Sequence, residues 1–178
     1  MALEDDVKIF DGKEIRQQEL SEAQSAQAEP ISQDQLDAAR VIGSSLAEMT
    51  KQAERGFELA IDDDLLLQRR LLLCFAVSTG LEENAATLQV ARTALNSFYD
   101  TLKRADPGFY DDIGNSGGLS FYYLAKRQRG DIERRIGQTF AMLCGKDGDP
   151  VCQELGEALY FRSLNMVRVE LEAKGLAK

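Results

Sequence analysis

The sequence predicts an all-α protein, folded as a compact bundle of about six helices. Apolar side chains recur at three- and four-residue steps along most of the chain, which is the spacing of one helix face. Only three of the 178 residues are proline, while Leu, Ala, Glu and Gln, which favour helix, are abundant. The length fits one domain, and a hydrophobic content of 44% is enough to bury a core.

Charge divides the chain unevenly. Residues 1–64 carry 16 acidic and 6 basic side chains, whereas residues 65–178 carry 14 acidic and 15 basic ones. The net charge of −9 therefore comes from the first third. Residues 1–29 also contain few large apolar side chains, so a helix there would have little to bury. We expect a polar, mobile or peripheral N-terminal segment over 1–29, acidic and helical, and a single helical domain over 30–178.

The first firm helix is expected from residue 32 to about residue 59. Ser32-x-x-Gln35 is a capping box, in which each side chain bonds a free backbone N–H of the other residue. The residues that follow form one apolar stripe at helical spacing. That stripe consists of Leu36, Ala39, Ile42, Leu46, Met49, Ala53 and Ala60.

A long central helix is expected next, because residues 65–79 are apolar on nearly every side. Asp62–Asp64 would cap its start, and Gly80 is placed to end it. Arg69 and Arg70 interrupt this apolar run. Their spacing from the three aspartates would allow ion pairs within the first two turns.

A third helix is expected over 82–104, on a face formed by Leu88, Ala91, Leu95, Phe98 and Leu102. Asp106–Pro107 then has the pattern of an N-cap followed by proline at the first helical position, which predicts a short turn of helix. Gly114–Gly118 contains three glycines in five residues and is expected to be a loop.

Three helices complete the predicted bundle. The fourth is expected over 119–129 and the fifth over 132–143. The pattern leaves open whether Gly130 separates these two helices or bends a single one. Asp149–Pro150 repeats the cap-and-proline pattern and opens the last helix, expected from about residue 150 to Lys174.

Arg162 is the most informative single residue, because it falls near the middle of an apolar stripe on the last helix. A guanidinium stays charged, so in a core it needs a carboxylate, several carbonyls or a bound anion. A structural ion pair or a side chain that reaches solvent is the alternative. With Asn165 one turn on, and with Tyr99 and Tyr122, it forms our candidate ligand site. The stripe comprises Val151, Leu155, Ala158, Met166, Val169 and Ala173.

The three cysteines favour a reduced, cytoplasmic environment. Cys74, Cys144 and Cys152 are odd in number and form no Cys-x-x-Cys motif, which argues against a disulfide framework. A bridge between Cys144 and Cys152 stays open. We expect no signal peptide at the start and no membrane span, since no apolar run approaches about 20 residues.

Composition excludes several function classes. The chain has no histidine, which rules out Ser-His and Cys-His catalytic pairs and histidine-ligated metal sites. The acidic balance argues against DNA and anionic membranes as partners. Glu154-x-x-Glu157 and Glu19-x-x-Glu22 place carboxylates on one helix face, but magnesium sites need oxygens from several elements. A magnesium-dependent hydrolase is therefore the third function considered, and no cofactor is expected.

The leading hypothesis is a binding protein rather than an enzyme. We expect a protein-interaction or self-associating module that presents its acidic first helices. The alternative is a small-molecule or anion-binding protein with a pocket between helices near Arg162, because helix bundles build ligand sites from facing side chains.

Overall fold

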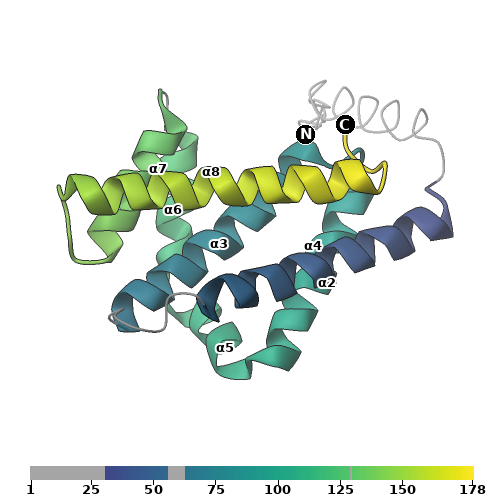
Figure 1. Cartoon of the computed structure of the whole chain (residues 1–178), viewed down its shortest axis with the longest axis horizontal. Coiled ribbons are helices and arrows are strands. Elements are labelled where there is room, and N and C mark those ends of the chain that lie inside the picture. The colour runs from purple at the N-terminus through teal and green to yellow at the C-terminus, as the bar shows by residue number, and fades with distance from the viewer. Residues whose placement is uncertain (1–30, 56–62, 129) are drawn as a thin grey trace, which may run out of the picture. The chain divides into compact units, whose positions relative to one another are not determined.

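The computed structural model describes residues 31–55, 63–128 and 130–178. The chain divides between Ser32 and Gln33 into two units. The second unit, Gln33–Lys178, is the helical domain shown in Figure 1. The expectations for residues 1–29, and for the end of the first helix near residue 59, lie outside the described residues.

The described residues form seven helices and no strand, which confirms the predicted all-α bundle. One antiparallel bridge joins Ala85 to Ala177, with a hydrogen bond from the Ala86 N–H to the Leu176 carbonyl of 2.7 Å. The helices are α2 (Gln33–Arg55), α3 (Asp63–Asn84), α4 (Leu88–Ala105), α5 (Pro107–Asn115), α6 (Gly118–Arg127), α7 (Ile132–Leu143) and α8 (Pro150–Ala173).

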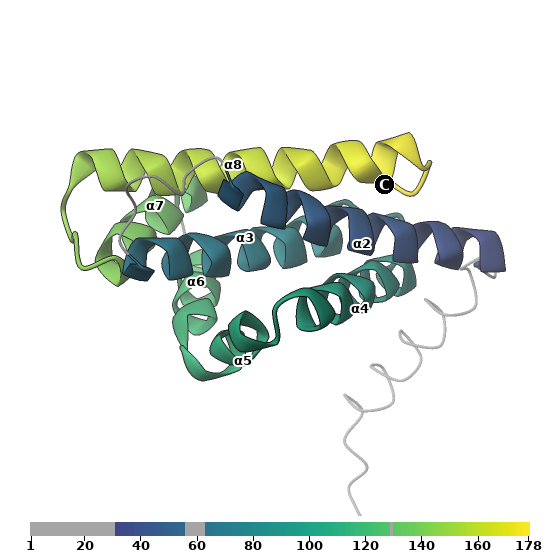
Figure 2. The ribbon, with the colours of Figure 1, turned by 60° about the horizontal axis from the view of Figure 1, so that its bottom comes forward.

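Helix α3 contacts five other helices: α2, α4, α6, α7 and α8. All residues from Leu71 to Leu81 are buried. Figure 1 shows α3 crossing behind α8, and Figure 2 shows α3 between α8 and α4. An apolar surface on every side of α3 therefore finds a neighbour in each direction.

Gly80 does not end α3, so that prediction is wrong. The helix continues to Asn84, and residues 82–84 belong to α3 rather than to the helix predicted over 82–104. A Cβ on Gly80 would lie 3.0 Å from the Cβ of Val167, so the missing side chain makes room for α8. The next helix, α4, starts at Leu88, where Thr87 accepts a hydrogen bond from the Val90 N–H at 3.2 Å.

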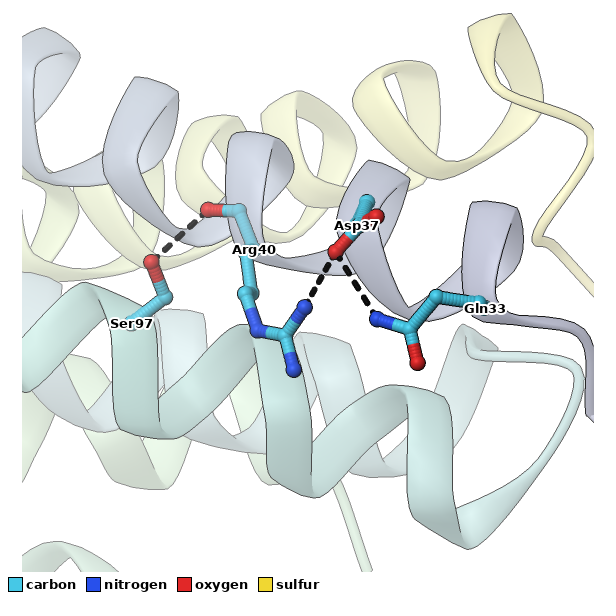
Figure 3. A network of polar contacts seen from close by, with 4 residues as sticks. All are labelled: Gln33, Asp37, Arg40 and Ser97. Atoms are coloured by element: carbon cyan, nitrogen blue, oxygen red, sulfur yellow. Dashed lines mark hydrogen bonds and ion pairs between the residues drawn. The ribbon is translucent and has the colours of Figure 1, made fainter.

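Helices α2 and α4 pack closely at Gly43. A Cβ on Gly43 would lie 2.0 Å from the Ala94 carbonyl oxygen, so only glycine allows this approach. A polar contact joins the two helices nearby: the Ser97 hydroxyl of α4 donates to the Arg40 carbonyl of α2 at 2.7 Å (Figure 3). Within α2, the Asp37 carboxylate accepts bonds from the side chains of Arg40 and Gln33.

Helix α5 has the predicted N-cap and first-turn proline, and it extends over nine residues. The Asp106 carboxylate accepts from the Phe109 N–H at 3.0 Å and pairs with Arg70 at 2.6 Å. The Arg70 guanidinium also lies 3.9 Å from the centre of the Phe109 ring. Arg70 thus pairs with a cap that is distant in sequence. The predicted pairing of Arg69 and Arg70 with Asp62–Asp64 stays a prediction, since the side chains of these aspartates lie outside the described part of the chain.

The second half of the domain follows the sequence closely. Helix α7 has the predicted bounds, and α8 begins at Pro150 with Asp149 as its N-cap. Gly130 breaks the helix rather than bending it: its φ is +107°, and the side chain of Asp131 caps a new helix, α7. The loop predicted over 114–118 is shorter, because α5 continues through Asn115 and α6 starts at Gly118.

The buried face of α8 differs from the predicted stripe, which is a second correction. The predicted stripe faces outward: Val151 is 74% exposed, and Leu155 and Val169 are also exposed. Helix α7 packs closely against the inner face at Gly156, where an added Cβ would lie 2.7 Å from the Phe140 Cβ. The buried residues of α8 are Cys152, Gly156, Tyr160, Ser163, Val167 and Leu171.

The contact at Gly43 predicts a stability loss on adding a methyl group. Gly43→Ala is expected to lower the free energy of unfolding by about 1–3 kcal/mol, since backbone atoms of α4 must move. Urea denaturation measures the change. Gly114→Ala is the matched control: nothing lies within 4 Å of its added Cβ, so it should be neutral or stabilising by up to about 1 kcal/mol. Equal stability of Gly43→Ala and the wild type would contradict the packing argument.

The cap of α5 predicts a pH-dependent contribution to stability. The hydrogen bond from Arg70 lowers the pKa of the Asp106 carboxyl, and the Phe109 N–H acts in the same direction. Because the folded-state pKa is depressed, the stabilisation is present above the unfolded value of about 3.9 and is lost as pH falls through the folded value. Asp106→Asn keeps a capping oxygen but removes the charge.

Asp106→Asn should therefore be less stable than the wild type at pH 7, and the difference should shrink toward pH 3. Denaturant titrations at several pH values measure this. A difference that stays constant with pH would show that the Arg70 pair contributes nothing through charge.

Candidate functional site

A cavity of about 380 Å³ lies where α2, α3 and α8 meet. Each helix contributes to its wall: the C-terminal half of α2, the first turns of α3 and the middle of α8. The two views of the domain show these three helices running beside one another (Figures 1 and 2). The lining residues are Met49, Thr50, Arg69, Leu73, Leu159, Arg162, Ser163 and Met166.

Two arginines bring positive charge to this cavity from different helices. Arg69 is only 6% exposed, because it lies on the helix that the other elements enclose. Arg162 is exposed, and it makes no hydrogen bond or ion pair with another residue in the described ranges. The described lining contains no acidic side chain. Arg162 therefore offers a charged hydrogen-bond donor to a small anion at the cavity mouth.

The rest of the wall is mainly apolar. Two leucines and two methionines, whose thioethers adapt to varied shapes, supply this surface. The hydroxyls of Thr50 and Ser163 donate to the carbonyls of Leu46 and Leu159 at 2.8 and 2.7 Å. Their lone pairs still accept hydrogen bonds, while their protons are engaged. The chemistry fits a ligand with an anionic head and an apolar body.

The structure does not bring the four predicted site residues together. Arg162 lines the α2–α3–α8 cavity, whereas Asn165 lines a different hollow and accepts a bond from Arg168 at 2.8 Å. Tyr99 on α4 has its hydroxyl 3.1 Å from the Ser78 hydroxyl. Tyr122 on α6 is fully buried in the core.

Tyr122 belongs to an aromatic cluster around Phe75 of α3. Its ring stacks on Phe75 with centroids 5.4 Å apart, and Tyr160 of α8 stacks on the same ring at 5.9 Å. Burial raises the pKa of Tyr122 well above its ordinary value and that of Tyr160 to about 12. Burial likewise raises the pKa of Tyr99. All three phenols stay neutral at physiological pH.

The sequence pattern missed most of the cavity wall. It gave no role in ligand binding to Arg69, Thr50 or Ser163. A signal was present for Arg69, because a charged residue inside an all-round apolar helix must face a polar or hydrated space. The two hydroxyl residues carry no comparable signal, since serine and threonine bond back to their own helix in any surroundings.

Comparisons of the chain with models of protein families, with curated proteins and with solved structures give no match. Within the described residues, no group of three or more His, Cys, Asp or Glu side chains is placed to hold a metal ion. No helix of the same ranges is both long and apolar enough to cross a bilayer. No disulfide joins the three cysteines, all of which lie in the described part.

The two arginines should differ in their effect on stability. Arg69→Ala is expected to lower the free energy of unfolding by about 1–3 kcal/mol or more, because a buried side chain and its stem packing are lost. Arg162→Ala should leave stability close to that of the wild type, since the side chain is exposed. Thermal and urea unfolding test this order, and a larger loss for Arg162→Ala would refute it.

Proposed function

We propose that this domain binds a small amphipathic anion, a carboxylate with an apolar body, in the α2–α3–α8 cavity. The observation that carries the proposal is the joint placement of Arg69 and Arg162 on a wall otherwise formed by leucine, methionine and hydroxyl side chains. Ligand pockets in proteins typically combine a mainly apolar lining with a few polar groups that fix orientation.

The two arginines have different roles in this proposal. Arg162 lies at the mouth without a partner in the described chain, so it is available to pair with an anionic head. Arg69 is buried and places a second guanidinium on the inner wall of the cavity. The apolar body of the ligand would pack against Leu73, Leu159 and the methionines, where removal of apolar surface from water supplies affinity.

Octanoate, 1-octanol and inorganic phosphate are suitable probes, since they separate the head from the tail. Octanoate should bind to the full chain in isothermal titration calorimetry, and the neutral alcohol and bare phosphate should bind much more weakly. Arg162→Gln should weaken octanoate binding by about tenfold, as expected for loss of a charged hydrogen bond.

Arg168→Gln is the matched control, because Arg168 lies on the same helix outside the cavity and should leave binding unchanged. Equal affinity for octanoate and 1-octanol would contradict the anion proposal. Unchanged binding by Arg162→Gln would contradict the assigned site, and no binding by any amphipathic probe would contradict the function.

The second candidate function is a protein-interaction or self-associating module. It is favoured by three large exposed apolar side chains that line one hollow beside α6 and α7: Phe121, Leu124 and Met142. Exposed apolar groups that gather in one place are typical of interaction sites. We place either role in the cytoplasm, on the grounds that the cysteines are odd in number and form no Cys-x-x-Cys motif.

A further inference from the structure

Two of the three cysteines flank the corner between α7 and α8. Cys144 is the C-cap residue of α7, and Cys152 lies in the first turn of α8, where its backbone N–H donates to the Asp149 carboxylate at 3.2 Å. The connection folds back tightly, because the Lys146 N–H donates to the Ala141 carbonyl at 2.8 Å. Only residues 145–149 therefore separate Cys144 from the start of α8.

The packing of the two helices places both cysteines on the sides that touch. At Gly156 of α8, an added Cβ would lie 2.7 Å from the Phe140 Cβ of α7. Cys144 follows Phe140 by one turn, and its N–H donates to the Phe140 carbonyl at 3.0 Å, so the helical path continues to it. Cys152 precedes Gly156 by one turn on the buried face of α8. Because residues four apart share a helix face, one turn from this contact toward the connection leads to a cysteine on each helix.

A buried hydroxyl adjoins both thiols. Tyr122 of α6 is fully buried, and its hydroxyl has no hydrogen-bond partner among the described residues. Burial raises the pKa of Tyr122 well above its ordinary value, and the neighbouring thiols of Cys144 and Cys152 add to the rise. The neutral phenol is a hydrogen-bond donor, and an oxygen atom added to either sulfur would give it an acceptor.

The three cysteines differ in their access to solvent. Cys144 is partly exposed, whereas Cys152 is 6% exposed and Cys74 of α3 is fully enclosed. Cysteines that react with oxidants are accessible and have a second thiol nearby that resolves the first oxidation product. Cys144 and Cys152 meet both conditions. Cys74 lies on another helix and provides a control within the same chain.

We propose that Cys144 and Cys152 form a reversible redox site, which hydrogen peroxide converts into an intramolecular disulfide. The Cys144 thiolate attacks one peroxide oxygen, the O–O bond breaks, and hydroxide leaves and takes up a proton, so that Cys144 becomes a sulfenic acid. The Cys152 thiolate then attacks this sulfur, the S–O bond breaks, and a second water forms as the S–S bond closes.

The reaction oxidises two thiols and reduces one peroxide to two waters. Two molecules of a small thiol such as glutathione reverse it by exchange and become one oxidised disulfide themselves. The inference goes beyond both candidate functions and does not depend on either.

Peptide mapping of the full chain without reductant tests the bond directly. The native protein is treated with hydrogen peroxide, remaining thiols are blocked with N-ethylmaleimide, and the denatured chain is digested with trypsin. Cleavage after Lys146 separates the two cysteines, so only a disulfide holds the Cys144 and Cys152 peptides together. We expect this linked pair, lighter by two hydrogen atoms than the two reduced peptides, and we expect glutathione to abolish it. Cys74 should lose its thiol at least about tenfold more slowly than Cys144.

Substitutions test the order of the two steps. In Cys152→Ser the sulfenic acid on Cys144 has no resolving thiol, so the sulfenic-acid reagent dimedone should label Cys144. In Cys144→Ser the remaining thiol of the pair is buried, and dimedone labelling of Cys152 should be at least about tenfold slower. Cys74→Ala is the matched control and should give the linked peptides at the wild-type rate. Thermal unfolding establishes that each variant folds, and Cys152→Ala replaces Cys152→Ser where the latter does not.

Three results would overturn the inference. The first is a native chain that keeps all three thiols while glutathione in the same solution is oxidised by the peroxide. The second is a bond that contains Cys74, or that joins two chains, in place of the bond between Cys144 and Cys152. The third, dimedone labelling of Cys152 but not of Cys144, would overturn the assignment of Cys144 as the attacking thiol.

Discussion

The helices of this domain approach one another most closely where glycine leaves room for a neighbouring helix. Gly43 lets α2 settle against the backbone of α4, Gly80 admits Val167 of α8 beside α3, and Gly156 receives Phe140 of α7. Because the core is densely packed, an added methyl group at such a contact forces the neighbouring helix to shift. The contacts at Gly80 and Gly156 fix the position of α8, and hence the shape of the α2–α3–α8 cavity that α8 lines.

Local signals in the sequence were sufficient for the starts of α5 and α8. Asp106–Pro107 and Asp149–Pro150 each predicted a cap and a first helical turn, and the structure has both. A cap depends on a side chain and the N–H groups two or three residues away, so no knowledge of the fold is needed. Gly80 misled the same reasoning, because a glycine at the end of an apolar run equally serves close packing inside a longer helix.

The orientation of α8 could not be read from its own residues. The helix carries two stripes, and the one with more large aliphatic side chains faces outward. Burial of the other stripe is decided by Gly80 and Phe140, which belong to other helices. The sequence therefore identified Arg162 as exceptional and predicted either a pocket between helices beside it or a side chain that reaches solvent. In the structure Arg162 is exposed and lines a cavity. Arg69 is the arginine that the fold encloses.

Hydrogen bonds join residues 176–178 to the corner between α3 and α4. Besides the bond between Ala86 and Leu176, the Lys178 backbone donates to the Asn84 carbonyl at 2.8 Å, and its ammonium group donates to the carbonyls of Glu82 and Glu83. Removing the Lys178 ammonium group would therefore loosen the corner between α3 and α4 without touching any apolar contact of the core.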